Sequence, residues 1–219
     1  MKKIMFSDKF GLTEAVLSGR KTQTRRIASE SLWDKWTEYD DFCGSVGVRG
    51  LNEIGVAVTR EYSDCEKFFL DNSPFKVGEV VAVAQSYKDA GVNYLLEEDD
   101  EFGCYNFPAE QTNGWTNKMF VRADLMPHQI RITDVRVERL QDITYEDCLA
   151  EGVELNPRQY EYDGLKLYFV RNLGHWRMFG CDNFKIPREA YAALIDRISG
   201  KGTWQSNPYV FVYEFELIK

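Results

Sequence analysis

The residues best suited to chemistry lie in one stretch near the amino end, residues 19–26, whose sequence is GRKTQTRR. Four cationic side chains and two threonine hydroxyls occupy these eight residues. A run of solvated charges has little use for interleaved threonines, whereas a site for an anion or a nucleotide uses both cations and hydroxyls. The stretch therefore predicts such a site, but its composition does not show whether the ligand is cleaved or only held.

The distribution of charge favours a small ligand over a long nucleic acid. The chain of 219 residues has a formal net charge of −8, whereas its first 26 residues carry seven basic side chains against two acidic ones. Broad, non-specific binding to nucleic acid depends on neutralising many phosphates, which an acidic chain opposes. A short basic segment in an otherwise acidic protein suits one anionic or nucleotide-sized ligand.

The elements around this stretch must position its side chains. Apolar residues at helical spacing predict a helix over residues 9–18, and Gly19 stands where a helix-ending glycine belongs. Residues 22–27 predict a strand, because threonine favours extended backbone. Lys21 falls in the turn between them, and its amine could reach over the face that carries Thr24. Regular alternation would place Thr22, Thr24 and Arg26 on one face of the strand and Gln23, Arg25 and Ile27 on the other.

Four further strands are predicted, at residues 4–6, 80–84, 129–140 and 209–218. The second of them is apolar without alternation, which predicts that both its faces are covered. In the third, the apolar phase slips by one residue at Thr133-Asp134, as a β-bulge or a barrel corner would produce. The last alternates, which predicts a single core face made of Phe211, Tyr213, Phe215 and Leu217.

Helices are predicted between these strands. Thr144 can cap a short helix with its hydroxyl, because Asp147 stands at the third helical position, and this helix ends at Glu151. A proline suits the first position of a helix over residues 187–198. Another helix is predicted over residues 31–41.

Three aromatic-rich segments, at about 28–74, 88–116 and 154–186, are interpreted as insertions into one domain. The first also predicts a strand near residues 54–60. The second holds five consecutive acids at residues 97–101, which predict a solvated loop rather than a metal site. The chain as a whole predicts a single α+β domain, built as a small mixed β-barrel with short flanking helices.

Composition excludes several classes of protein. No run of about 18 apolar residues exists, so no membrane span is expected, and the amino end does not resemble a secretory signal. Five cysteines without a Cys-x-x-Cys pair predict reduced thiols in a cytoplasm. No cofactor or metal is expected. A zinc site could draw on Cys104, His128, His175 and Cys181, but their spacing does not require one.

Several motifs together resemble the ASCH domain family, which has a PUA-like β-barrel. They are GRKTxTxR at residues 19–26, VGEVV at 77–81 and VxVYEF at 210–215. The similarity is strongest to a phage and prophage branch, which also carries RVERLQDI, here residues 136–143, and GTWxxNP, here residues 202–208. The resemblance covers both ends and the centre, about half of the chain, and leaves the three insertions outside.

The resemblance implies an activity and a set of residues. A small bacterial member of the wider family is a 4-acetylcytidine amidohydrolase, with a lysine, a threonine and a glutamate proposed as catalytic. By motif these fall on Lys21, Thr24 and Glu151, the last through the helix that begins at Thr144. Other members are described as RNA-binding proteins or as ribonucleases, so the family does not define one activity.

The chemistry of these residue types fits amide hydrolysis. Thr24 could supply the nucleophilic hydroxyl, Lys21 the base if its amine is neutral, and Glu151 the acid for the leaving nitrogen. Burial and nearby cations would have to lower the pKa of Lys21. Taken without the resemblance, Lys21 is more often a phosphate-binding or solvated lysine, Thr24 a packed strand residue and Glu151 an ordinary helix-end carboxylate. The candidate ligand-binding residues are Arg20, Thr22, Arg25 and Arg26.

Three functions therefore remain open. The first is hydrolysis of an acylated cytosine such as 4-acetylcytidine. The second is a non-catalytic RNA- or nucleotide-binding module of a phage or mobile element, and the third is a ribonuclease. All three imply a nucleoside, a nucleotide or RNA as the partner.

Overall fold

The structure is a computed structural model of residues 1–219, and it describes residues 1–46, 64–99, 103–156, 166–173 and 183–218. The strand expected near residues 54–60 lies outside the described residues, as do parts of all three insertions. The described part contains helices and a mixed sheet of five strands, as expected for an α+β chain.

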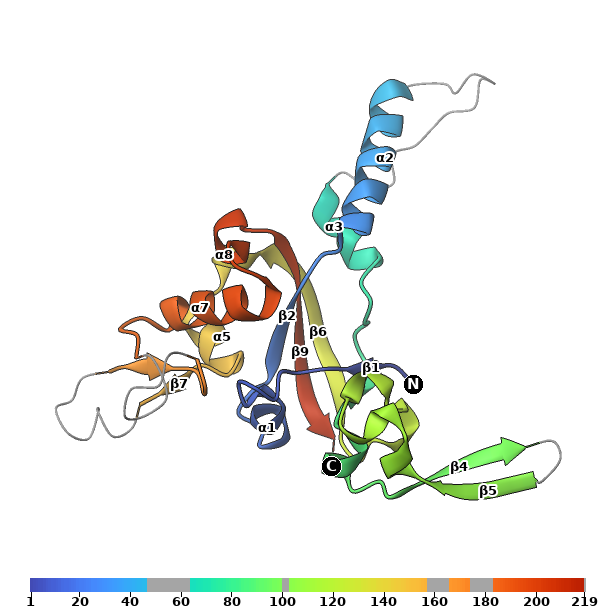
Figure 1. The fold of residues 1–219 in the computed structure, drawn as a ribbon. Helices are drawn as coiled ribbons and strands as arrows, with labels where there is room; N and C mark the ends of the chain where they lie inside the picture. The colour runs from blue at the N-terminus through green and yellow to red at the C-terminus, as the bar shows by residue number, and fades with distance from the viewer. Residues whose placement is uncertain (47–63, 100–102, 157–165, 174–182, 219) are drawn as a thin grey trace.

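The central sheet has the order β1-β3-β6-β9-β2 (Figure 1). Only β1 and β3 are parallel, and each other neighbouring pair is antiparallel. Hydrogen bonds do not join β1 to β2, so the sheet is not closed into a barrel by its ladders. The strands are β1 (Lys3–Ile4), β2 (Gln23–Ile27), β3 (Val80–Val83), β6 (Gln129–Arg139) and β9 (Tyr209–Ile218).

The predicted bulge in the long strand β6 is confirmed. Its register against β9 shifts between Ile132 and Asp134, so Thr133 has no partner. Because one residue is skipped, Val135 returns to the face that carries Ile132, and the apolar side chains on both sides of the bulge share one core face.

The prediction of a single core face for β9 is wrong. Val210 and Val212 point away from the predicted face, yet both are buried. They belong to the same buried cluster as Ala190 and Leu194 of helix α7 (Pro187–Ser199). The strand is therefore covered on both faces over its first half, and only its last residues alternate with exposed positions.

Three local predictions around the site are confirmed. Gly19 follows helix α1 (Leu12–Leu17) with a φ of 74°, the left-handed conformation of a helix-ending glycine. Helix α5 (Tyr145–Ala150) begins with a capping box between Thr144 and Asp147. Helix α7 begins at its proline, and the short helix α8 (Thr203–Ser206) follows it.

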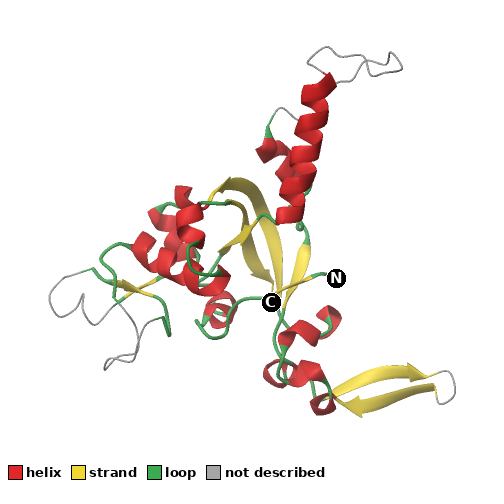
Figure 2. Cartoon of the chain, turned by 45° about the horizontal axis from the view of Figure 1, so that its top comes forward, coloured by secondary structure: helices red, strands yellow, loops and turns green. Residues whose placement is uncertain are grey.

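The first two insertions project from the sheet (Figures 1 and 2). Helix α2 (Glu30–Val46) is longer than predicted, and it packs on α3 (Cys65–Asp71) through the edge-to-face rings of Trp33 and Phe69. The second insertion carries α4 (Tyr87–Ala90) and a hairpin of β4 (Tyr94–Asp99) and β5 (Gly103–Pro108).

The hairpin corrects the interpretation of the acidic run. Glu97, Glu98 and Asp99 are paired strand residues of β4 rather than part of a loop.

Short 3-10 helices follow the hairpin. They are η1 (Ala109–Gln111), η2 (Asn113–Trp115), η3 (Lys118–Phe120) and η4 (Ala123–Leu125), and η5 (Leu140–Asp142) follows β6. In the third insertion, β7 (Glu154–Leu155) pairs with β8 (Tyr168–Phe169). Within the ranges described, no helix combines the length and apolar character needed to cross a bilayer.

Candidate functional site

Lys21 and Glu151 form a buried pair, although 130 residues separate them. The backbone N–H of Lys21 donates to Ala15 of α1, which holds the lysine in the turn before β2. Its Nζ donates to Oε2 of Glu151 at 2.6 Å and to the Glu151 carbonyl at 2.8 Å. The two side chains are only 2% and 5% exposed. Contact with water is therefore almost absent, and the pair depends on its own hydrogen bonds.

The end of helix α5 must approach the first strand closely to make this pair. The N–H of Thr22 donates to the carbonyl of Ala150 at 3.0 Å, which ties the helix end to β2. Gly152 follows with a φ of 102°, and a methyl group there would lie 3.1 Å from Leu12 and 3.8 Å from the Lys21 side chain. A glycine at this position thus satisfies both the backbone conformation and the close approach.

Burial lowers the pKa of the Lys21 amine below its ordinary value of 10.5. The carboxylate of Glu151 opposes this shift, whereas the nearby cations Arg26 and Arg25 add to it. The net direction favours the neutral amine. Nζ and Oε2 lie within hydrogen-bonding distance, so a proton can pass directly between the two side chains.

Thr24 lies on β2 in the wall of the same cavity. This cavity has a volume of about 420 Å³, and Lys21, Thr24 and Glu151 all line it. No hydrogen bond joins the Thr24 hydroxyl to any residue that the structure describes. The three residues named by motif therefore converge on one space, and the hydroxyl is available to a ligand there.

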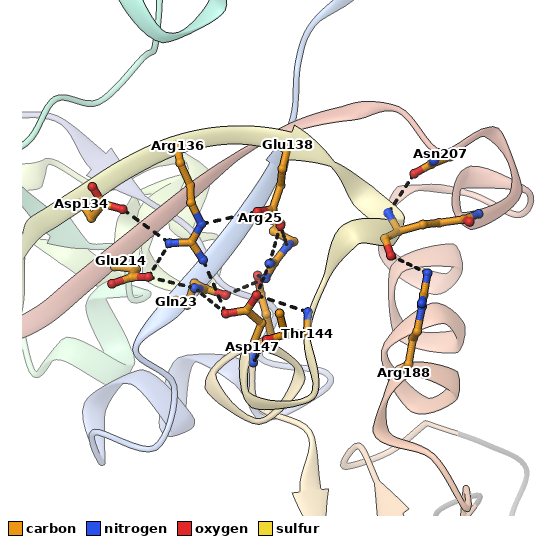
Figure 3. Close-up of polar contacts among 12 residues, drawn as sticks. Gln23, Arg25, Asp134, Arg136, Glu138, Thr144, Asp147, Arg188, Asn207 and Glu214 are labelled. Atoms are coloured by element: carbon orange, nitrogen blue, oxygen red, sulfur yellow. Dashed lines mark hydrogen bonds and ion pairs between the residues drawn. The ribbon is translucent and has the colours of Figure 1, made fainter. Parts of the chain in front are cut away.

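Arg25 also contacts Glu151, since its Nη1 donates to Oε1 at 3.3 Å; Figure 3 shows its contacts with Gln23, Glu138 and Asp147. All five of its guanidinium N–H groups are used, on Gln23, Glu138, Asp147 and Glu151. Its side chain is 0% exposed, and the carboxylates keep its pKa above the ordinary value. Arg25 has no donor left for a ligand, so its contacts assign it to the support of Glu151.

Arg136 extends this network towards solvent (Figure 3). Its guanidinium pairs with Asp134, Glu138, Asp147 and Glu214, and it is 34% exposed. Burial alone would raise the pKa of Asp147. The charge of Arg25, together with hydrogen bonds that Asp147 accepts from Gln23 and Arg25, nevertheless keeps this pKa below its ordinary value. Two arginines, on β2 and β6, and four carboxylates on β6, β9 and α5 thus form one network, in which Arg25 makes the direct contact with Glu151.

Of the remaining ligand-binding candidates, Arg26 lines the cavity with Lys21, whereas Arg20 and Thr22 do not. Arg26 lines the cavity, and its guanidinium lies 5.6 Å from the ring of Phe6. Arg20 lies outside it and pairs with Glu154 at 2.8 Å. Thr22 is exposed and lines a different cavity of about 250 Å³. The alternation predicted for β2 is confirmed by its register against β9, so Thr24 and Arg26 share a face.

The sequence did not reveal the apolar wall of the cavity. The centre of the Phe6 ring lies 5.8 Å from the Lys21 amine, and Tyr191, Leu194 and Ile195 of α7 also line the cavity. The helix over residues 187–198 was predicted, but its sequence gives no sign that some of its apolar residues face a cavity rather than the core. Glu138 and Glu214 lie within quoted motifs and Asp147 was predicted as part of a helix cap, but no pattern in the sequence linked these acids to Arg25 or Arg136.

The residues considered for zinc do not form a site in the described part. Nδ1 of His128 lies 2.7 Å from the amide oxygen of Gln85. His175 and Cys181 lie outside the described residues. Searching the described ranges finds no group of three or more side chains able to hold a metal ion.

Comparison with known proteins gives no relative. The chain matches no protein-family model, no curated protein and no solved structure. The function must therefore be argued from the geometry of the cavity.

Proposed function

We propose that the protein hydrolyses the exocyclic amide of an acylated cytosine, with 4-acetylcytidine as the leading substrate. We also propose that it is an ASCH-like protein whose five-stranded sheet is a variant of the PUA-like barrel. The observation that carries the proposal is the convergence of Lys21, Thr24 and Glu151 on one cavity of about 420 Å³. A general base, a hydroxyl and an acid in one partly apolar space are the groups that amide hydrolysis needs.

The proposed cycle begins with a neutral amine on Lys21 and with Glu151 carrying the one proton that the two side chains share. Lys21 removes the hydroxyl proton of Thr24 as Oγ1 attacks the acyl carbon. Glu151 then donates its proton to the exocyclic nitrogen, the C–N bond breaks, and cytidine leaves with the acetyl group held as an ester on Thr24. The lysine is now an ammonium and the glutamate a carboxylate.

Water completes the reaction and restores this state. A water molecule attacks the ester carbon and gives its proton to Glu151. Lys21 returns its proton to Oγ1 of Thr24 as the ester C–O bond breaks, and acetic acid leaves. Because the pair begins and ends with one shared proton, the cycle needs no outside acid or base. Desolvation of Lys21 supports the neutral form that begins the cycle.

The direct test is turnover by the purified protein over a panel of acylated nucleosides. The proposal predicts release of cytidine from 4-acetylcytidine, and loss of this release in Lys21→Met. Absence of release from every member of the panel, with a folded protein, would refute it. A chromatographic assay separates nucleoside and product directly.

One observation favours a second candidate, a nucleotide-binding module without catalysis. Most N–H donors of the Arg26 guanidinium make no hydrogen bond to a described residue, which leaves them available to an anionic ligand. This candidate predicts saturable binding of cytidine nucleotides with no turnover. We place either activity in the cytoplasm, which agrees with the free thiols of Cys43, Cys65 and Cys148.

A further inference from the structure

A second cavity adjoins the proposed active site. It has a volume of about 250 Å³, and Arg26 and Ile27 line both cavities. Its polar wall is formed by Arg26 of β2 and by residues of the first insertion. That wall consists of Arg26, Ser29, Ser31, Lys35 and Asn72. None of the described residues that line this cavity carries a carboxylate.

Arg26 contrasts with its neighbour Arg25, whose five donors are all engaged. For Arg26, Nη2 donates to the carbonyl of Met5, and Nε is the one buried side-chain polar atom in the described part of the chain without a partner. Nη1 makes no hydrogen bond there either, and it is not buried. A buried donor without an acceptor is costly, so the guanidinium is poised for an acceptor that a ligand supplies.

Lys35 provides a second cation on the same wall. Its side chain is exposed and makes no ion pair or hydrogen bond within the described residues. It stands on the second turn of α2, a helix of 17 residues. The hydroxyls of Ser29 and Ser31, which lie 3.1 Å apart, flank the first turn of that helix. The first amides of a helix lack intrahelical acceptors and, together with the helix dipole, favour an anion.

We propose that this second cavity is a phosphate subsite, and that the substrate of the adjoining cavity is therefore a phosphorylated nucleoside. The proposal rests on the proposed function for its choice of nucleoside. Two cations, two hydroxyls and a helix amino terminus, with no carboxylate among the described lining residues, match the negative charge and the acceptor oxygens of a phosphate. The shared Arg26 puts the phosphate beside the base-binding cavity.

Binding measurements test the subsite independently of catalysis. Calorimetric titration of the full chain compares cytidine, cytidine 5′-monophosphate, cytidine 3′-monophosphate and a short single-stranded oligoribonucleotide with a central cytidine. We expect at least one phosphorylated ligand to bind roughly tenfold or more tightly than cytidine, the effect of one charge-assisted contact. Tighter binding of a mononucleotide identifies a free nucleotide as the source of the phosphate. Tighter binding of the oligonucleotide identifies an RNA backbone instead.

Matched variants locate the effect. Lys35→Ala should reduce the affinity ratio of phosphorylated ligand to cytidine several-fold, and Lys35→Glu should reduce it further. Lys88→Ala, an exposed lysine that lines neither cavity, should keep the wild-type ratio. Lys35 is exposed, so its variants should fold, which circular dichroism checks.

The outcomes separate this inference from the proposed function. Equal affinity for cytidine and all phosphorylated ligands, or a preference that Lys35→Glu leaves intact, overturns the phosphate subsite. A Lys35-dependent preference without hydrolysis of any acylated cytosine supports the subsite and refutes the hydrolase. Hydrolysis of 4-acetylcytidine without a preference for phosphorylated ligands supports the hydrolase and refutes the phosphate subsite.

Discussion

Replacing Arg25 with methionine removes the central cation of the network around Glu151. Methionine has a similar length and keeps the packing of the side chain, so the change tests the charge and its hydrogen bonds. Five hydrogen bonds disappear, and the carboxylates of Glu138, Asp147 and Glu151 lose their common partner.

The expected loss follows from burial. The Arg25 side chain is 0% exposed, and its salt-bridge partners Glu138 and Asp147 are only 19% and 17% exposed, so solvent screens these interactions little. Breaking a buried ion pair by removing one partner costs about 3–5 kcal/mol, because a charge is left without compensation. Arg136→Met is the matched control. Arg136 contacts some of the same acids but is 34% exposed, so we expect a loss of about 1 kcal/mol.

Urea denaturation followed by circular dichroism measures both losses as changes in the free energy of unfolding. The loss for Arg25→Met should also depend on pH. The pKa of Asp147 lies below its ordinary value of 3.8 in the folded wild type, so its ion pair stabilises the fold above that pH and is lost as the pH falls further. The difference in free energy of unfolding between wild type and Arg25→Met should therefore become smaller at acidic pH. A loss for Arg25→Met no larger than that of Arg136→Met would refute the reasoning.

Three further perturbations have defined outcomes. Thr144→Ala removes the capping box of α5, which carries Asp147, and should lower the free energy of unfolding by about 1 kcal/mol in the same urea assay. Gly152→Ala places a side chain at a φ of 102° and should cost about 1–3 kcal/mol, seen as a lower melting temperature; an unchanged melting temperature contradicts the described turn. Arg26→Gln removes one cause of the lowered pKa of Lys21. Activity should be lost on the alkaline side as the shared proton leaves, so this variant should move the alkaline limb of the pH–rate profile to higher pH; an unmoved or acid-shifted limb opposes the assignment.

Local features of the chain were predictable from local sequence. The turn at Gly19, the alternation of β2, the bulge at Thr133 and the capping box at Thr144 each depend on residues within a few positions of one another. Backbone propensity and side-chain capping decide such features before tertiary packing does.

Features that depend on distant segments were not predictable in the same way. The cover over Val212 comes from α7, which lies outside the strand whose pattern was analysed. The acidic side chains of Glu97 and Glu98 did not prevent a strand, because pairing with β5 decides the backbone there. The full engagement of Arg25 depends on acids from two other elements, so the sequence could not separate it from Arg26.

The convergence of the candidate catalytic residues was predictable only in part. Spacing placed Lys21 in a turn and Thr24 on a strand face, but only the resemblance to ASCH proteins brought Glu151 into the set. The structure places all three on one cavity.

The most direct test of the account compares Thr24→Ala with Thr22→Ala for release of cytidine from 4-acetylcytidine. Both variants remove a hydroxyl from the same segment, but Thr24 lines the cavity with Lys21 and Glu151, whereas Thr22 is exposed outside it. The account predicts that Thr24→Ala abolishes release and that Thr22→Ala retains it at close to the wild-type rate. Equal rates for the two variants would contradict the claim that the Thr24 hydroxyl is the nucleophile.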